Sequence, residues 1–358
     1  MDIRQSTTAY EGWLKNELAG DLVEKDLEKK RGKMKDSAFV FLRATYWRWA
    51  EIIFEVCPDL SNAPGVLAVG DIHVENFGTW RDVDGRLVWG VNDFDEAAEM
   101  PFAIDLVRLA TSALLGRDDN RAALEPICNA MLKGYTEGLR APKPFVLDRD
   151  HLRMREIFVA SEDDRAAFWK KMEGDHDADE PQPGQRYLNG LSAAMPDADV
   201  QMNVRPRTAG TGSLGRPRWV ACAEWKGGPV VREAKAAIPP AWGRVPGRNA
   251  DKIAIMEIAR GRYRATDPWY QLTEKNVIVR RLSPNTRKIE IDKNREVLLQ
   301  DEMLEAMGCE LANVHLGVAD RSAAIQQDLN ARGNGWLVRA TEKAADATKR
   351  EFEQWKRG

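Results

Sequence analysis

One segment of the sequence, residues 66–95, constrains the fold more than any other. Its apolar beginning at 66–69 predicts a short buried strand, and a polar loop follows it, Gly70-Asp71-Ile72-His73-Val74-Glu75-Asn76-Phe77-Gly78. Asp84-Gly85 then supplies a tight turn between two β-prone flanks, which predicts a hairpin that ends at Asn92-Asp93-Phe94-Asp95. The chain must therefore fold so that two polar loops each emerge from the end of a strand.

The side chains of these loops have the spacing that phosphoryl transfer requires. Asp71 and Asn76 are five residues apart, the separation of the catalytic aspartate and the metal-binding asparagine in the kinase catalytic loop. Phosphoryl transfer needs an acceptor for the hydroxyl proton and oxygen ligands for the metal ions that bridge the phosphates. We predict that Asp71 is the base, that Asn76 and Asp93 bind Mg²⁺, and that Asp95 is an auxiliary ligand.

Two neighbouring residues have other candidate roles. His73 is a candidate catalytic or metal-binding group, although a single loop histidine more often orients its neighbours by hydrogen bonding. Asp105 is expected to be a buried structural acid at the start of a helix. A lone Gly-Asp more often caps a turn, but the Asp, the Asn, the Asp-Phe and a downstream Pro101-x-x-x-Asp105-Leu106 lie within one stretch of about 40 residues, which favours the functional interpretation.

A second candidate constellation lies in the other half of the chain. Gly210-Thr211-Gly212-Ser213-Leu214-Gly215 leads into a β-type segment at 219–225, so it fits a glycine-rich hairpin over nucleotide phosphates better than a dinucleotide-binding turn, which precedes a helix. Glycines let the backbone approach the phosphates, and a lysine on the next strand pairs with them. Lys235, twenty residues past the last glycine, lies on such a strand. The predicted nucleotide-binding residues are Gly210, Gly212, Ser213, Gly215 and Lys235.

A kinase-like lysine also needs a carboxylate partner on a helix behind the sheet. Glu257, in a helix expected near residues 250–264, is the first candidate for this partner and for the cofactor site, with Glu233 and Asp251 as rivals. Considered separately, the glycines are more often an ordinary hairpin turn, and Lys235 is more often an exposed strand residue. The prediction of a nucleotide site therefore rests on the spacing between the glycines and the lysine. Four arginines flank the glycines and either contact phosphates or are only solvated: Arg205, Arg207, Arg216 and Arg218.

These motifs resemble a known superfamily. Gly70-Asp71-x-His73-x-x-Asn76 with Asp93-Phe94 resembles the aminoglycoside and choline phosphotransferase branch of the protein-kinase-like superfamily. Together with Asp105-Leu106-x-Arg108-Leu109-Ala110 and the glycine run, the chain looks more closely like a bacterial domain-of-unknown-function family thought to be kinase-like, over roughly residues 30–320. The resemblance implies a kinase-like fold, ATP with Mg²⁺, and the roles given above to the two aspartates, the asparagine and the lysine. It does not supply a substrate.

The motif order differs from that of ordinary kinases, in which the glycine loop and the lysine precede the catalytic loop. A circular permutation explains the reversed order, because permutation is tolerated where chain termini lie close together at the surface. Leu311-Ala312-Asn313-Val314-His315 supports it, since this segment resembles the helix that directly precedes the catalytic loop in phosphotransferases. We therefore predict an α+β, bilobal, circularly permuted protein-kinase-like fold, with a helical catalytic lobe at 1–200, a β-rich nucleotide lobe at 201–295, and C-terminal helices at 296–358 that pack back on the catalytic lobe.

The predicted reaction is ATP- and Mg²⁺-dependent transfer of the γ-phosphoryl group to a hydroxyl of a small molecule. Three alternatives stay open at this point. Nucleotidyl transfer would use the same metal ligands, and a pseudokinase would bind nucleotide without turning it over. A metal-dependent hydrolase would use Asp71, His73, Asp93 and Asp95 as ligands.

Composition narrows the expected partners. The 53 basic and 56 acidic residues nearly balance and form no long run of one sign, so no nucleic-acid or membrane partner is expected. Four cysteines without a Cys-x-x-Cys pair suggest neither a disulfide framework nor a zinc site, which fits a cytoplasmic protein. Residues 173–186, rich in Asp, Pro and Gly, are predicted to be an exposed linker or loop.

Overall fold

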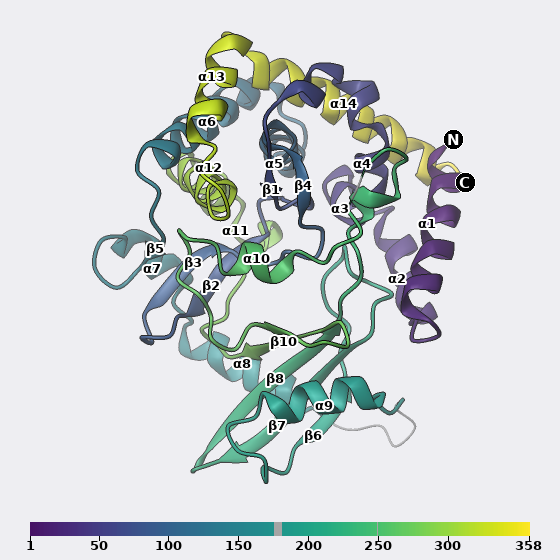
Figure 1. Cartoon of the computed structure of the whole chain (residues 1–358), viewed down its shortest axis with the longest axis vertical. Helices are drawn as coiled ribbons and strands as arrows, with labels where there is room; N and C mark the ends of the chain where they lie inside the picture. Colours follow the sequence, from purple (N-terminus) through teal and green to yellow (C-terminus); the bar gives the residue numbers. More distant parts are fainter. Residues whose placement is uncertain (175–180, 249) are drawn as a thin grey trace.

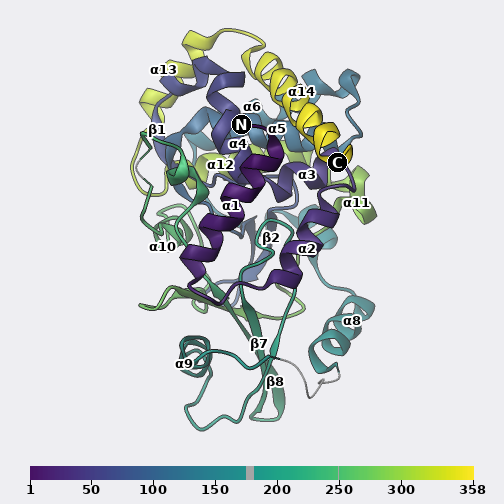
Figure 2. The ribbon, with the colours of Figure 1, turned by 90° about the vertical axis from the view of Figure 1, so that its right-hand side faces the viewer.

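The computed structural model describes residues 1–174, 181–248 and 250–358, and its fold is mixed α and β (Figure 1). Of the predicted linker at 173–186, residues 175–180 lie outside the described residues, 173 ends a helix and 185–186 begin the next one. A helical body forms one end of the molecule and a five-stranded sheet the other, an arrangement that a view from the side also shows (Figure 2). In the described part of the chain, no helix combines the length and the apolar character needed to cross a membrane.

Runs of helices and runs of strands follow one another along the chain. The α-helices are α1 (Ile3–Leu18), α2 (Glu24–Lys33), α3 (Ala38–Ala44), α4 (Tyr46–Val56), α5 (Phe102–Gly116), α6 (Leu124–Arg140), α7 (Leu152–Phe158), α8 (Glu162–Glu173), α9 (Gln185–Ala193), α10 (Ile255–Ala259), α11 (Ile291–Leu298), α12 (Asp301–His315), α13 (Ser322–Arg332) and α14 (Trp336–Lys356). The strands are β1 (Gly65–Ala68), β2 (Phe77–Arg81), β3 (Leu87–Val91), β4 (Ala98–Pro101), β5 (Phe145–Val146), β6 (Asn203–Pro206), β7 (Arg218–Trp225), β8 (Gly228–Ala236), β9 (Gln271–Leu272) and β10 (Val277–Leu282). Short 3₁₀ turns are η1 (Pro58–Asn62), η2 (Arg121–Ala123) and η3 (Ala241–Arg244).

The helical body is built around α5. Every residue of this helix is buried, as expected for an apolar helix at the centre of a domain rather than at its surface. Helices α3, α6 and α14 pack against it, and α12 packs along α6. The C-terminal helices α12 and α14 therefore lie on the same body as the helices of the first half of the chain (Figure 1).

Two small sheets connect this body to the polar loops. β1 pairs antiparallel with β4, and the loop predicted at 70–78 follows β1. β2 and β3 form the predicted hairpin around Asp84-Gly85, and β5 extends it on the far side of β3. The residues 92–95 leave this hairpin at the end of β3, so both polar loops emerge from strand ends as expected.

The larger sheet has the order β6-β7-β8-β10-β9, with every pair antiparallel. The glycine-rich loop connects β6 to β7, and Lys235 lies on β8, as the sequence predicts. α9 packs on β8 and β10, so the layer around this sheet begins before residue 201. α8 contributes Met172 to a small apolar cluster with sheet residues. The helix expected near 250–264 is shorter, because only α10 at 255–259 is helical.

Candidate active site

A cleft of about 630 Å³ lies where the larger sheet meets the helical body. Its walls come from the loop 70–78, the segment 92–96, the glycine-rich loop, the segment 280–292 after β10, and the end of α2 with α3. Eight of the site residues predicted from the sequence line it: Asp71, His73, Asn76, Asp93, Asp95, Gly210, Gly212 and Ser213. The fold thus brings together two constellations that lie far apart in the sequence.

A chain of buried polar groups holds the start of the loop 70–78. The Asp105 carboxylate on α5 accepts hydrogen bonds from the backbone N–H groups of Val69 (2.7 Å) and Gly70 (3.0 Å). His315 at the end of α12 contacts the same carboxylate through Nε2 at 3.1 Å, and its Nδ1 lies 2.8 Å from the hydroxyl of Tyr135 on α6. Asp105 is fully buried, which confirms the expected structural role of this acid.

Gly70 itself is required at this point of the loop. Its φ of +77° lies in the left-handed region, where a side chain is disfavoured. A Cβ at this position would also lie 2.5 Å from the carbonyl oxygen of Glu96 and 2.6 Å from the Tyr46 hydroxyl. The residue before Asp71 can therefore only be glycine in this conformation.

Asp71 is oriented by Arg108, a residue of the motif at 105–110 for which the sequence predicts no role. Nη2 of Arg108 lies 2.5 Å from Asp71 Oδ1 and also donates to the carbonyl oxygen of Leu42 at 2.9 Å. The Arg108 guanidinium is fully buried between the rings of Tyr46 and Trp49, each 5.1 Å away. Burial raises the pKa of Asp71 to about 6 although Arg108 acts to lower it. About a fifth of the Asp71 side chain is exposed, so a ligand in the cleft can reach it.

Asn76 connects the two polar loops. Its amide Nδ2 donates to the carbonyl oxygens of Asp71 (3.3 Å) and Asp93 (3.0 Å). Its Oδ1 is buried and has no hydrogen-bond partner among the described residues. A buried amide oxygen without a partner is unusual in a folded protein and is a free ligand for a cation.

The Asp93 carboxylate lies among cations. Lys235 Nζ is 3.6 Å and Lys288 Nζ 3.9 Å from its oxygens. Burial alone would raise the pKa of Asp93, but these lysines, with Arg280 and Arg218, hold it well below its usual range. Asp93 is therefore ionised at neutral pH, as a ligand for Mg²⁺ must be.

Within the described ranges, no three His, Cys, Asp or Glu side chains are grouped closely enough to hold a metal ion. A cation at Asn76 and Asp93 would take its other ligands from water or from a bound phosphate, as Mg²⁺ commonly does. The four-ligand hydrolase site is less well supported by the geometry, because two of its carboxylates are paired with cations: Asp71 with Arg108, and Asp95 with Lys235.

His73 contacts its own loop. Its Nδ1 accepts a hydrogen bond from the backbone N–H of Glu75 at 3.2 Å, which is the orienting role that is common for a loop histidine. Burial, with nearby Arg43 and Lys288, holds the pKa of His73 well below its usual value, so the ring is neutral. Its neighbour Glu75 pairs with Arg43 at 2.5 Å and accepts the N–H of Ile291 at 2.7 Å.

The carboxylate partner of Lys235 is not the one expected. Lys235 Nζ lies 2.6 Å from both oxygens of Asp95. Glu257 instead pairs with Lys252 at the surface, because the short α10 leaves its side chain 44% exposed. Of the two rivals, Glu233 is buried among arginines, and Asp251 lines a separate pocket beside Trp13.

The glycine-rich loop is held by the N-terminal helices. Near its start, Thr208 Oγ1 donates to Asp26 Oδ1 of α2 at 3.1 Å. At its end, the N–H of Val23 donates to the carbonyl oxygen of Gly215 at 3.0 Å. Gly215 lies against Leu27 of α2 and does not line the cleft.

The tip of this loop lies directly against Asp71. A Cβ at Gly212 would be 2.9 Å from Asp71 Oδ2, so the close approach depends on glycine. Lys30 of α2 donates from Nζ to the Gly212 carbonyl oxygen at 2.7 Å. This lysine is buried beside the rings of Tyr10 and Trp47, and burial lowers its pKa to about 7.

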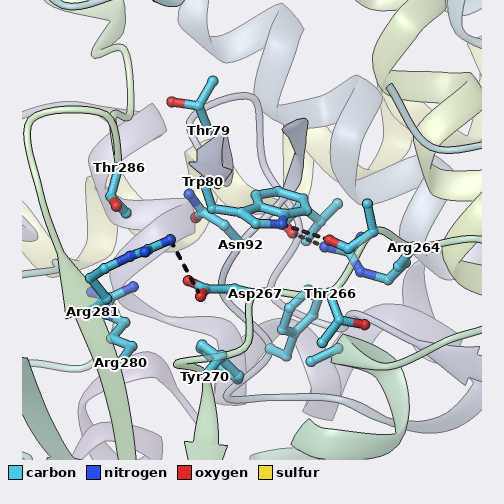
Figure 3. Close-up of a pocket in the computed structure, with 14 residues that line it drawn as sticks. Thr79, Trp80, Asn92, Arg264, Thr266, Asp267, Tyr270, Arg280, Arg281 and Thr286 are labelled. Atoms are coloured by element: carbon cyan, nitrogen blue, oxygen red, sulfur yellow. Dashed lines mark hydrogen bonds and ion pairs between the residues drawn. The ribbon is translucent and has the colours of Figure 1, made fainter. Parts of the chain in front are cut away.

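A smaller pocket of about 40 Å³ adjoins the cleft (Figure 3). Asn92, Arg280 and Thr286 line both spaces. In the close-up, an ion pair joins Arg281 to Asp267, with 3.8 Å between Nη2 and Oδ1. A space of this size holds water rather than a substrate, so the cleft is the candidate active site.

The fold and the cleft define a mixed α/β protein with two polar loops facing a glycine-rich hairpin. The chain belongs to the family described as "Uncharacterized protein conserved in bacteria (DUF2252)", whose model matches residues 22–172 and 194–358. The matched segments contain every cleft residue discussed above. No curated protein and no solved structure matches the chain.

Proposed function

We propose that this protein is an ATP- and Mg²⁺-dependent phosphotransferase that transfers the γ-phosphoryl group to a hydroxyl of a small molecule. The observation that carries the proposal is the Asn76 amide. It donates to the backbone of both Asp71 and Asp93 while its Oδ1 stays without a partner. A base and a charged oxygen ligand are thereby fixed relative to each other, with a neutral oxygen ligand between them.

The donor set fits magnesium. Asn76 Oδ1 and the Asp93 carboxylate are oxygen ligands, which this ion prefers, whereas both oxygens of Asp95 are paired with Lys235. When bound at these residues, Mg²⁺ would supply positive charge that neutralises the charge developing on the phosphate oxygens. The residues of the chain supply the rest. Asp71, oriented by Arg108, would accept the proton of the attacking hydroxyl, and the glycine-rich loop would cover the phosphates and exclude water.

The proposed fold is bilobal and kinase-like, with a circular permutation. Its support is the position of α12, which lies at the far end of the sequence yet contacts the acid that holds the loop 70–78. In the unpermuted order, this helix would lead straight into that loop. The larger sheet, with its glycine-rich connection and Lys235 on the next strand, would be the nucleotide lobe.

The first test is binding and turnover by wild type, Asp71→Asn and Asp93→Asn. Thermal stability is measured with ATP, with and without Mg²⁺, and ADP release is then measured against a panel of small hydroxyl compounds. Ligand at about 100 times its dissociation constant adds roughly 2.7 kcal/mol to the free energy of unfolding, which shifts the midpoint by several degrees. Asp71→Asn should keep Mg-ATP binding and lose turnover, and Asp93→Asn should also weaken binding.

Asp163→Asn, an exposed aspartate at the start of α8, is the matched control and should behave as wild type. Pyrophosphate release in place of ADP would point to nucleotidyl transfer. Unchanged turnover in Asp71→Asn would remove Asp71 as the base. No thermal shift with millimolar ATP would overturn the whole proposal.

A further inference from the structure

Three arginines of the cleft wall converge on one buried carboxylate. Glu233 on β8 is 1% exposed, and its Oε1 accepts from Arg218 Nη1 (2.7 Å) and Arg280 Nε (2.8 Å). Arg207 pairs with its other oxygen, Oε2. All three arginines line the cleft, whereas Glu233 lies behind them. The arrangement is a layer of guanidinium groups on a single anionic support.

The sheet register explains why these groups share a face. Glu233 is opposite Arg280 on β10, and Lys235 is opposite Arg218 on β7. Residues directly opposite each other in a sheet point to the same side, as do residues two apart on one strand. Arg207 joins them from the loop, where its N–H pairs with the carbonyl oxygen of Arg218. The strand order therefore places a basic face toward the cleft.

The carboxylate keeps its charge in this position. Burial alone would raise the pKa of Glu233, but Arg218, Arg280 and Arg207 lower it well below its usual range. An ionised Glu233 fixes the three side chains that it contacts. Ser213 of the glycine-rich loop also accepts from Arg218 Nη2 at 2.9 Å, so the loop and the arginines form one surface.

Lys235, the residue expected to meet phosphates, is already engaged. Its Nζ lies 2.6 Å from each of the two Asp95 carboxylate oxygens and 3.6 Å from Asp93 Oδ1. Arg280 has donors to spare, whereas Arg218 uses Nη1 on Glu233 and Nη2 on Ser213. Arg280 uses Nε on Glu233, and its Nη1 and Nη2 have no partner among the described residues. Glu233, Asp95 and Asp93 supply three negative charges against five cations, Arg207, Arg218, Arg280, Lys235 and Lys288, so an excess of positive charge remains.

We propose that Arg207, Arg218 and Arg280, aligned by Glu233, bind the phosphate chain of the nucleotide directly and do so without a metal ion. The two Nη groups of Arg280 can bind one phosphate with two hydrogen bonds, and Arg207 and Arg218 place two further guanidinium charges beside it for the neighbouring phosphate groups. The identity of the chain as that of a nucleoside triphosphate rests on the proposed function. Glu233 is a positioning residue here, since it acts through the arginines.

The test uses inorganic tripolyphosphate, which has neither base nor sugar, in buffer with a chelator that removes divalent cations. Binding to the full chain is measured by calorimetry for wild type and for Arg280→Gln and Arg280→Lys. Arg281→Gln is the matched control, because Arg281 is the next residue on the same strand and pairs with Asp267 away from the cleft. Thermal unfolding of each variant confirms that it is folded.

We expect Arg280→Gln to raise the dissociation constant at least about tenfold and Arg281→Gln to change it less than about twofold. Arg280→Lys should lie between them, because it keeps the charge and loses the fork. Glu233→Gln should weaken binding as well, by releasing the arginines. Equal dissociation constants for wild type and Arg280→Gln, or no binding by wild type, would overturn the inference.

The outcomes separate this inference from the proposed function. Tripolyphosphate binding that depends on Arg280, in a protein that turns over no hydroxyl compound, would leave the arginine site standing and remove the phosphotransferase. ADP release by Arg280→Gln with an unchanged KM for ATP would support the phosphotransferase and remove the arginine site.

Discussion

The two loops that face each other across the cleft are held in opposite ways. The loop 70–78 is fixed from within, by fully buried groups on α5 and α12. The glycine-rich loop is fixed from outside, by a few polar contacts to the N-terminal helix α2. The first set of hydrogen bonds is fully buried, whereas the second is only partly buried, so water competes more with the second set and it opens at a lower free energy. The cleft therefore has one rigid wall and one adjustable wall.

Asp105→Ala should have the largest effect and bears on the rigid wall. The substitution removes a buried carboxylate and leaves two backbone N–H groups and His315 without their partner. Losing one member of such a buried set lowers the free energy of unfolding by about 3–5 kcal/mol. Urea unfolding monitored by tryptophan fluorescence measures this loss of unfolding free energy. A loss below about 1 kcal/mol would mean that the wall is no more rigid than its neighbour.

Lys30→Met tests the adjustable wall through its pH dependence. The folded protein releases the Lys30 proton near pH 7, whereas the unfolded chain keeps it up to its ordinary pKa of 10.5. Since the unfolded state then binds more protons, the wild type gains stability as pH rises above 7, by at most about 1.4 kcal/mol per pH unit. The variant lacks this gain. Urea unfolding at about pH 7 and about pH 8 measures the difference, and parallel curves for the two proteins would contradict the assignment.

Gly212→Ala should have the smallest effect and tests how far the adjustable wall can give. Its Cβ would lie 2.9 Å from Asp71 Oδ2 and 3.2 Å from the carbonyl oxygen of Arg43. Because the loop can move away, we expect unchanged stability and ATP turnover reduced about fivefold, roughly 1 kcal/mol. Gly228→Ala is the control, since a Cβ there meets nothing within 4 Å. Normal turnover in Gly212→Ala would show that the tip need not approach Asp71.

The sequence predicts the rigid wall better than the adjustable one, for a physical reason. The strand, the polar loop and the Asp-Gly hairpin follow from neighbouring residues, and Asp105 follows from its position at a helix start. Arg108 could have been found too, because it lies three residues after Asp105 and both face the loop from one side of α5. The loop 70–78 and its support on α5 can therefore be predicted from residues that are close together in the sequence.

The remaining contacts depend on long-range packing, which no local pattern encodes. Lys30 and Gly212 are 182 residues apart, and Lys235 and Asp95 are 140 apart. From the sequence alone, the arginines that flank the glycines either contact phosphates or are only solvated. The strand register is what places Arg218 on the same face as Glu233, which it contacts. The sequence favours Glu257 as the partner of Lys235 because its pattern predicts a longer helix than the five-residue α10 that forms there.

The contact between Asp105 and His315 affects how the protein can fold while it is being synthesised. These residues are 210 positions apart, so a ribosome adding about 5–20 residues per second makes His315 roughly 10–40 s after Asp105. During that interval the apolar surface of α5 that α14 later covers lies open to water and to chaperones. A nascent chain that ends before α12 lacks His315, so the Asp105 carboxylate that holds the loop 70–78 has to fold without this partner until the second half of the protein is made.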